Sequence, residues 1–133
     1  MSENQAKQPP AQSGDDNALL EANLERVFNE RDAERRLAAI GDLYTRDAVL
    51  YEPDGAVSGH AAISDTVGKL LGTLGPGFLF TPDGAAAGHH GLGYARWTGG
   101  SKGGPVVVTD MDVGRFEGGR ITALHVFIDP PKA

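Results

Sequence analysis

The stretch VVVTDMDVGRFEGGRITALHVFID, residues 106–129, constrains the fold more than any other part of the chain. Two runs rich in β-branched and aromatic residues flank the turn sequence EGG, which predicts an antiparallel hairpin. Asp110 and Asp112 lie two positions apart in the first run. Because side chains alternate between the two faces of a strand, both carboxyl groups must share one face. That face either meets water or lines a pocket.

Three helices are predicted ahead of this hairpin. Apolar residues recur at helical spacing over residues 17–28, beginning at Asn17, a favourable N-cap residue. A second amphipathic pattern covers residues 32–44, and a break near Arg31 and Asp32 separates it from the first. A third pattern runs from about residue 60 to residue 74 and ends at the sequence GPG.

Strand and turn patterns occupy the remaining chain. The sequence AVLYEP, residues 48–53, predicts a short strand closed by a proline, and a second short extended segment follows at AVSG. Four consecutive strands are then predicted in GFLFTPDGAAAG, LGYARWTGG, PVVVTDMDVGRFEGG and RITALHVFID. Helices followed by such a meander predict an α+β domain, with one curved antiparallel sheet and the helices packed on one of its faces.

The chain has the length and composition of one globular domain, with 133 residues, of which 40% are hydrophobic and 23% charged. Residues 1–16 are mostly polar and include two prolines, so we expect a disordered N-terminal tail there. The folded domain is expected to span residues 17–129, and residues 130–133 form a short C-terminal tail.

Charge and residue usage exclude several functions. The formal charge is −6 and the basic residues are scattered, so we expect no binding to nucleic acid. The chain has no cysteine, which excludes disulfides, thiolate metal sites and a cysteine nucleophile. No apolar run approaches the roughly 18 residues that span a bilayer, so we expect a cytoplasmic protein without membrane contact.

The segments YTRDAVLYEPDGAVSGHAAI and DVGRFEGGRITALHVFID together resemble the nuclear transport factor 2-like superfamily, in particular its SnoaL-like polyketide cyclase and ketosteroid isomerase branch. The resemblance covers about residues 20–129. It implies a cystatin-like α+β roll: a cone-shaped, curved and mixed but mostly antiparallel sheet, with three N-terminal helices that enclose a pocket. It also implies a homodimer through the outer sheet face, where alternation places His125.

The resemblance assigns roles to individual residues. The motif DVGRF is similar to the isomerase motif whose protonated aspartic acid donates to the oxyanion, which implies that role for Asp112. In LYEP, Glu52 occupies the position of the general base. Phe28 stands where the isomerases carry a second oxyanion donor, a tyrosine, and Trp97 stands at an aromatic position of their pocket wall.

Further pocket residues follow from alternation and from the resemblance. Asp110 shares the face of Asp112, so it either lines the pocket or lies at its wet rim, and Leu124 and Val126 are expected to face inward. Val126 also stands where the epoxide hydrolases of the superfamily carry an aspartate, so their reaction is not expected. His89, within GHHG, is open to three interpretations: a turn or rim residue, a pocket acid or base, or a metal ligand.

We therefore expect a SnoaL-like enzyme, of lyase or isomerase type, that moves a proton next to a carbonyl group of a small apolar ligand. Glu52 would remove the proton and Asp112 would donate one, because two carboxyl groups in different environments can act as base and acid. This chemistry requires no metal and no organic cofactor. The alternative is a non-catalytic domain of the same fold that binds a small molecule or a partner copy. An enzyme should enclose Glu52 and Asp112 in one cavity.

Overall fold

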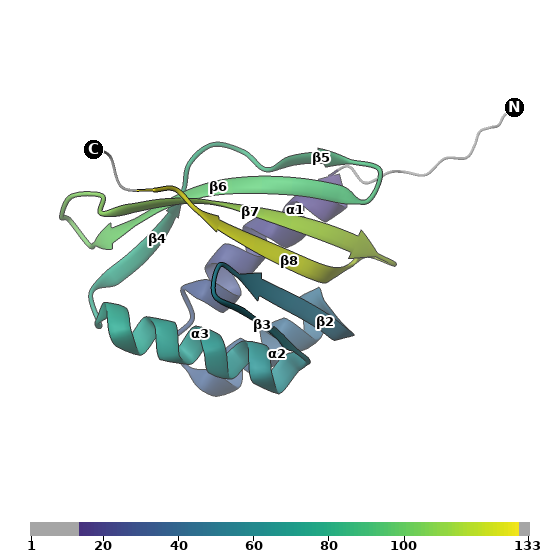
Figure 1. Ribbon diagram of the computed structural model, residues 1–133, viewed down its shortest axis with the longest axis horizontal. Helices are drawn as coiled ribbons and strands as arrows, with labels where there is room; N and C mark the ends of the chain where they lie inside the picture. The colour runs from purple at the N-terminus through teal and green to yellow at the C-terminus, as the bar shows by residue number, and fades with distance from the viewer. Residues whose placement is uncertain (1–13, 131–133) are drawn as a thin grey trace, which may run out of the picture.

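The computed structural model describes residues 14–130 (Figure 1). The predicted tails therefore lie largely outside the described residues, namely at positions 1–13 and 131–133. The helices are α1 (Gly14–Asn23), the π-helical turn η1 (Leu24–Phe28), α2 (Ala33–Leu43) and α3 (His60–Leu74). Because α1 begins at Gly14, Asn17 lies inside the helix, and the expectation that it is the N-cap was wrong.

The break between the first two helices is confirmed, and local hydrogen bonds explain it. The backbone N–H of Asn29 donates to the Leu24 carbonyl oxygen at 3.0 Å, five residues back, as in a π-helix. The carboxylate of Asp32 then accepts from the backbone N–H of Arg35 at 2.9 Å and caps the start of α2. Two short helices therefore follow one another in place of one long helix.

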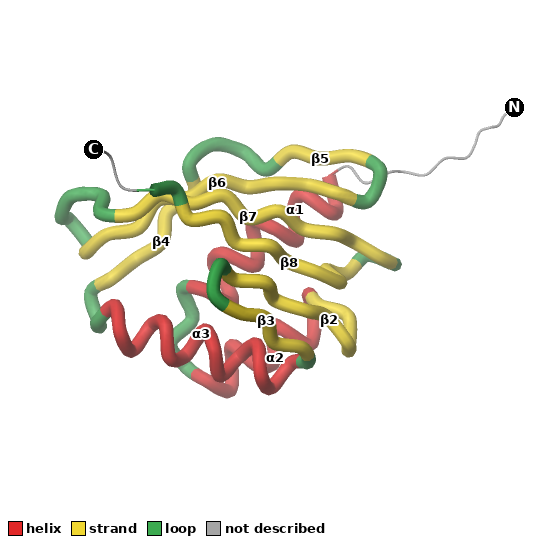
Figure 2. The backbone as a smooth tube through the Cα atoms, in the orientation of Figure 1, coloured by secondary structure: helices red, strands yellow, loops and turns green. Residues whose placement is uncertain are grey.

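The strands form one sheet of seven (Figure 2). They are β2 (Tyr44–Glu52), β3 (Gly55–Ser58), β4 (Phe78–Pro82), β5 (Ala87–His89), β6 (Leu92–Ser101), β7 (Val108–Glu117) and β8 (Arg120–Ile128). Their order is β3-β2-β8-β7-β6-β4, and β5 pairs with β6. Only the β2–β8 pair is parallel within residues 14–130. The curved, mixed and mostly antiparallel sheet of an α+β fold is thus confirmed.

One predicted strand divides into two. The segment GFLFTPDGAAAG forms β4 and, after a loop, the start of β5, because Pro82 ends the first strand. Both short strands pair with β6, one at each end of it. The loop between them brings Pro82 and Ala86 close to the first helix.

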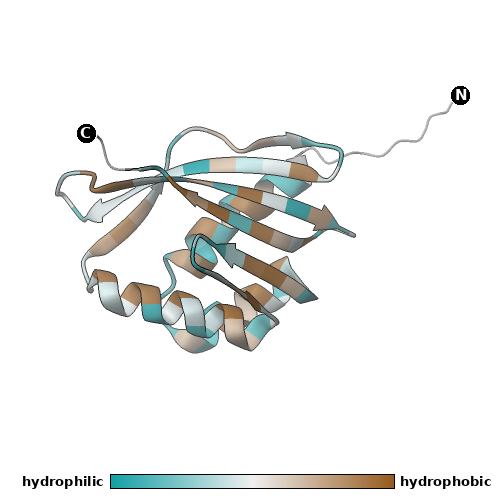
Figure 3. Ribbon diagram, viewed as in Figure 1, coloured by the Kyte–Doolittle hydropathy of each residue, from teal (hydrophilic) through white to brown (hydrophobic). Residues whose placement is uncertain are grey.

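The core lies between the helices and the concave face of the sheet. Figure 3 shows hydrophobic residues recurring along the helices and along the central strands. Most of the predicted apolar positions of the helices are buried, including Leu24, Val27, Ile63, Val67 and Leu71, whereas Leu37 of α2 is 43% exposed. No helix among residues 14–130 combines the length and the apolar character that crossing a membrane requires.

Candidate functional site

The two aspartates of β7 point into the core. Asp110 is 0% exposed and Asp112 is 4% exposed. Met111, which lies between them, and Val113, which follows Asp112, are only half-buried. The alternation predicted from the spacing of two therefore operates here, and it directs both carboxyl groups to the concave face. The face that they share does not meet water.

Neither carboxyl group has a full set of partners. Both oxygens of Asp110 and the Oδ1 atom of Asp112 are buried and accept no hydrogen bond from an N–H or hydroxyl group in the described part of the chain, although the two carboxyl groups lie close enough to share a proton. The indole Nε1 atom of Trp97, the cross-strand neighbour of Asp110, is buried and unbonded as well. Buried polar atoms without partners are costly and rare in native proteins, so their concentration here is typical of a site that receives a ligand.

The environment raises the pKa of both aspartates. Burial raises the pKa of Asp110 to about 9, and the neighbouring charge of Asp112 adds to the effect. Burial also raises the pKa of Asp112 to about 6, although Asp110 and the nearby Trp97 N–H offset part of the rise. The two groups titrate as a pair, and the first proton is lost preferentially from Asp112. At neutral pH the pair therefore holds one proton, mainly on Asp110.

A second polar pair lies in the core near the aspartates, and the sequence analysis missed it. The hydroxyl of Tyr44 donates to Asn23 Oδ1 at 2.6 Å, and Asn23 Nδ2 is buried without a partner. Burial, followed by the charge of Asp112, raises the pKa of Tyr44. The signal in the sequence was Asn23 itself, a polar residue within the apolar stripe of residues 17–28.

A small cavity opens beside Asp112. Its volume is about 20 Å³, enough for roughly one water molecule. The first helices, the β4–β5 loop and strands β6 and β7 all contribute to its lining, which consists of Leu20, Glu21, Leu24, Pro82, Gly84, Ala86, Ala95, Arg96, Trp97 and Asp112. A wider groove of about 380 Å³ shares Glu21, Leu24 and Pro82 with this cavity.

Aromatic rings form the wall behind the cavity. The ring centroids of Trp97 and Phe80 are 4.6 Å apart, those of Phe80 and Phe28 are 6.3 Å apart, and both pairs meet edge to face. Phe28 and Trp97 are buried at 3% and 6% exposure. Both therefore contribute to the apolar interior, but only Trp97 lines the cavity itself.

Glu52 lies on the same face as Asp112 but outside its cavity. Tyr51 of β2 pairs with His125 of β8, so the next residue, Glu52, lies beside Val126. Val126 in turn pairs with Asp112 of β7, so Glu52 and Asp112 lie on the same face of the sheet. Two strand spacings separate Glu52 from Asp112, roughly 10 Å between backbones. Glu52 is half-buried, and burial followed by the charge of Asp54 raises its pKa. The expected enclosure of both carboxyl groups in one cavity is not found.

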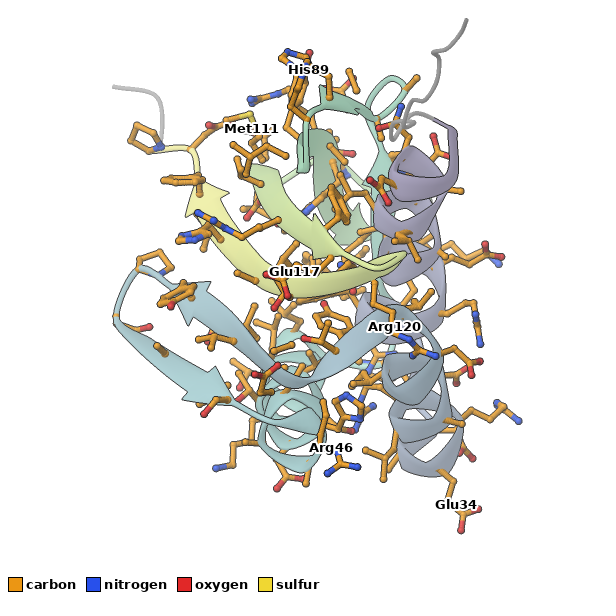
Figure 4. The ribbon with its side chains drawn as sticks, turned by 90° about the vertical axis from the view of Figure 1, so that its right-hand side faces the viewer. Glu34, Arg46, His89, Met111, Glu117 and Arg120 are labelled. Carbon is orange, nitrogen blue, oxygen red and sulfur yellow. The ribbon has the colours of Figure 1, made fainter. Side chains whose placement is uncertain are left out.

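His89 lies at a turn, the first of its three interpretations, and not in the pocket lining. It is exposed at the end of β5, where Figure 4 shows it at the margin of the molecule. Its Nδ1 atom is 2.8 Å from that of His90, a turn residue with a φ of 54°. Flanking glycines shape this hairpin, which holds both rings in solvent.

The two β8 residues that were expected to face inward are less exposed than His89. Leu124 is fully buried and Val126 is half-buried.

No group of three or more histidine, aspartate or glutamate side chains in residues 14–130 is arranged to hold a metal ion. The carboxyl pair of β7 comes nearest in chemistry, but it offers only two residues.

The family model of the SnoaL-like domain matches residues 22–124 of the chain. The chain belongs to the SnoaL-like family. The matched region contains both aspartates of β7, Trp97 and Glu52, and it includes every strand at least in part. A comparison with curated proteins finds no match.

Solved structures share the fold of this SnoaL-like chain. A candidate isomerase of the SnoaL-like family from Agrobacterium tumefaciens superposes with a TM-score of 0.81 at 24% identity, covering 89% of this chain and all (100%) of the other. A cystatin-like protein of unknown function from Methylobium petroleophilum reaches 0.71 at 20% identity, covering 94% and 82%. A candidate ketosteroid isomerase from Kribbella flavida reaches 0.64 at 15% identity, covering 90% and 84%. Identities this low establish the fold alone.

Proposed function

We propose that this protein catalyses proton transfer next to the carbonyl group of a small, largely apolar ligand, as an isomerase or a lyase, with Asp112 as the general base. The observation that carries the proposal is the buried carboxyl pair of β7, whose Asp112 Oδ1 atom is unbonded beside a cavity. A carboxylate with a raised pKa is a stronger base than one in water, and it stays ionised at neutral pH.

The roles differ from those that the sequence implied. Asp112, expected to act as a neutral acid, is the group that loses its proton first. Asp112 would take a proton from the carbon next to the carbonyl, and the electron pair of that C–H bond would move onto the carbonyl oxygen. The Trp97 N–H lies beside Asp112 and would donate to the resulting enolate oxygen. Returning the proton to another carbon completes an isomerisation; loss of a leaving group completes a lyase reaction.

Asp110 supports Asp112 by remaining protonated. Two adjacent carboxylates in an apolar interior would repel each other, so a proton on Asp110 leaves only one charge in the pair. Asp112 can then pass from carboxylate to acid during the reaction while Asp110 stays neutral. Asp110 is thus a positioning residue that sets the basicity of Asp112.

The experiment compares Asp112→Asn with Glu52→Gln. The readout is exchange of α-hydrogens for deuterium in a panel of methyl ketones headed by para-methylacetophenone, followed by NMR. We expect the wild type to accelerate the exchange, Asp112→Asn to lose at least about a hundredfold, and Glu52→Gln to stay within a few fold. Loss in Glu52→Gln with full exchange in Asp112→Asn would assign the base to Glu52. Exchange at the uncatalysed rate across the panel would overturn the enzymatic proposal.

The second candidate function is ligand binding without chemistry. The groove of about 380 Å³ favours it, because it has the volume of a small-molecule site but is not lined by Asp112, and the cavity beside Asp112 holds only about 20 Å³. Under this alternative, the methyl ketones raise the melting temperature without exchanging hydrogen, and Asp112→Asn leaves that binding unchanged.

We also propose that two copies associate through the outer sheet face. Tyr51, His125 and Phe127 stack in a row there, with ring centroids 4.4 and 6.4 Å apart. Tyr51 is 40% exposed and Phe127 is 52% exposed, and exposed Tyr94 lies further along the same face. Exposed aromatic side chains in a contiguous patch are typical of protein interfaces.

A further inference from the structure

Asn23 is a polar residue on the face of the first helices that covers the carboxyl pair. It is 0% exposed, and its neighbours on that face, Leu20, Leu24 and Val27, are buried apolar residues. Leu20 and Leu24 line the cavity beside Asp112, so this face of the helix packs over the site. A buried amide costs free energy unless both of its polar atoms are hydrogen-bonded.

One end of the Asn23 amide has a partner and the other end has none. The Oδ1 atom accepts the hydroxyl proton of Tyr44 at 2.6 Å, and Tyr44 is only 1% exposed. This bond fixes which end of the amide faces Tyr44, because a hydroxyl group has a single proton to donate. The Nδ2 atom is buried and makes no hydrogen bond within residues 14–130. The amide therefore presents an N–H donor to its remaining surroundings.

The bonded pair of Tyr44 and Asn23 lies close to Asp112. Tyr44 begins β2, whose parallel neighbour β8 pairs directly with β7, the strand of Asp112. The charge of Asp112 contributes to the raised pKa of Tyr44, which shows that the two groups interact in the interior. The Oδ1 atom of Asp112 accepts no hydrogen bond from an N–H or hydroxyl group in the described chain. A donor and an acceptor that both lack partners are thus neighbours beneath one helix face.

A second N–H donor at Asp112 fits the chemistry of a carboxylate. The Trp97 N–H already lowers the pKa of Asp112 from β6. An ionised carboxyl group has about four lone-pair positions, so it accepts more than one hydrogen bond. Leaving a buried donor or acceptor unbonded costs about 1–3 kcal/mol, and more for a charged group, so a bond between Asn23 and Asp112 removes two such costs together.

We propose that Asn23 is a positioning residue for Asp112: its Nδ2 N–H, oriented by Tyr44, donates to the Asp112 carboxylate directly or through one water molecule. The cavity beside Asp112, of about 20 Å³, has room for that water. The bond stabilises the ionised form of Asp112, the form in which it acts as a base. The inference rests on the proposed function for this catalytic consequence only, since the hydrogen bond itself requires no reaction.

Loss of the Asn23 amide should raise the pKa of Asp112, because a hydrogen bond to the charged form lowers the pKa. The effect is separable from those of the other groups around Asp112, which stay unchanged when Asn23 is replaced. Strand β8 contributes apolar side chains there, Leu124 and Val126. The ionisable groups are Asp110 of β7, Tyr44 and Glu52 of β2, Glu21 of α1 and Arg96 of β6, whose guanidinium pairs with Asp129.

The first test uses the wild-type full chain and requires no variant to fold. NMR follows the carboxyl carbon of Asp112 and the side-chain amide protons of Asn23 from about pH 4 to about pH 8, a range that brackets the ionisation of Asp112. We expect the amide protons to move downfield with the midpoint of the first titration step of the carboxyl pair. Amide protons that stay constant while Asp112 ionises would overturn the inference.

Three variants then assign the donor. Asn23→Leu should raise the pKa of that first step by about one unit, a tenfold change in proton affinity. Tyr44→Phe leaves the amide in place but frees it to rotate, so it should raise the pKa by less. Ser64→Ala is the matched control, because it removes a buried hydroxyl that contacts Arg36 at 3.1 Å and should leave the pKa of Asp112 unchanged. An unchanged pKa in Asn23→Leu, or a larger rise in Tyr44→Phe, would overturn the assignment to Asn23.

The two proposals fail separately. A wild type that exchanges ketone hydrogens, with an Asp112 pKa that ignores Asn23→Leu, would sustain the proposed function and reject the role of Asn23. A wild type that exchanges no hydrogen, with an Asp112 pKa that rises in Asn23→Leu, would keep the hydrogen bond and reject the chemistry. Where both hold, the pH of half-maximal exchange should rise in Asn23→Leu by the same amount as the pKa.

Discussion

Asp110 and Asp112 differ in their polar neighbours and therefore in the proton that each holds. Burial raises the pKa of both, but the charges of Asp112 and Asp129 raise the pKa of Asp110 further, whereas Asp110 and the Trp97 N–H hold the pKa of Asp112 down. A second buried charge is strongly disfavoured, so Asp110 stays neutral and Asp112 carries the charge. The division of roles within the pair thus follows from the groups that surround each carboxyl group.

The sequence identified these residues better than it identified their roles. Alternation along β7 was sufficient to place both aspartates on one face, and DVGRF singled out Asp112. Their protonation depends on burial and on neighbours from other parts of the chain, such as Trp97 and Asp129, which no spacing within β7 encodes. Likewise, the bond between Tyr44 and Asn23 joins residues 21 positions apart, and only the folded chain brings them together.

At the scale of elements, helix α1 packs against the sheet beside the cavity that contains Asp112. Leu20 of α1 lines the cavity and lies over the glycines of β6 and β7. A Cβ atom at Gly114 would stand 3.0 Å from Leu20 Cδ2 and 3.1 Å from the Phe116 ring, and one at Gly93 would stand 3.1 Å from a carbonyl oxygen. These glycines allow the helix to approach the strands closely.

Replacing Gly114 with alanine should therefore destabilise the protein by about 1–3 kcal/mol, because the added methyl group forces Leu20 or Phe116 to shift. Urea unfolding followed by circular dichroism measures the change. Gly72→Ala is the matched control: a Cβ atom there, on helix α3, meets open space. It should leave stability unchanged or raise it by up to about 1 kcal/mol. Equal effects in the two variants would contradict the packing of α1 described here.

The elements themselves were largely predictable. Apolar stripes gave three of the helical segments and period-two patterns gave most strands, since both signals are local. The division of GFLFTPDGAAAG into β4 and β5 was missed, although Pro82 marked it. The parallel pairing of β2 with β8 joins distant parts of the chain, so periodicity could not reveal it, and only the family resemblance implied a mixed sheet.

At the scale of the whole molecule, we predict that the dimer proposed for the outer sheet face is disrupted by a single lysine substitution. Phe127→Lys should place a charge within the stacked row of Tyr51 and His125 and shift the protein to monomer in sedimentation equilibrium. Leu37→Lys introduces the same charge at an exposed leucine on α2 and should leave the oligomeric state unchanged. A monomeric wild type, or a dimer that tolerates Phe127→Lys, would reject this interface.

The pH dependence of the free energy of unfolding depends on the proton that the carboxyl pair holds. The unfolded chain releases the Asp110 proton near its ordinary value of 3.8, whereas the folded chain retains it to about pH 9. Between these values the unfolded state binds fewer protons, so the free energy of unfolding falls as pH rises, by at most about 1.4 kcal/mol per pH unit for one proton. The carboxylates with lowered pKa, such as Asp129, act at more acidic pH.

The most direct test of the account is therefore the free energy of unfolding, measured by urea titration from pH 5 to pH 8 in the wild type and in Asp110→Asn. The account predicts that the wild type loses stability across this range and that Asp110→Asn, which has no proton to release, loses clearly less. The exposed control Asp47→Asn should follow the wild type. Parallel curves for the wild type and Asp110→Asn would contradict the claim that β7 carries a buried, protonated carboxyl pair.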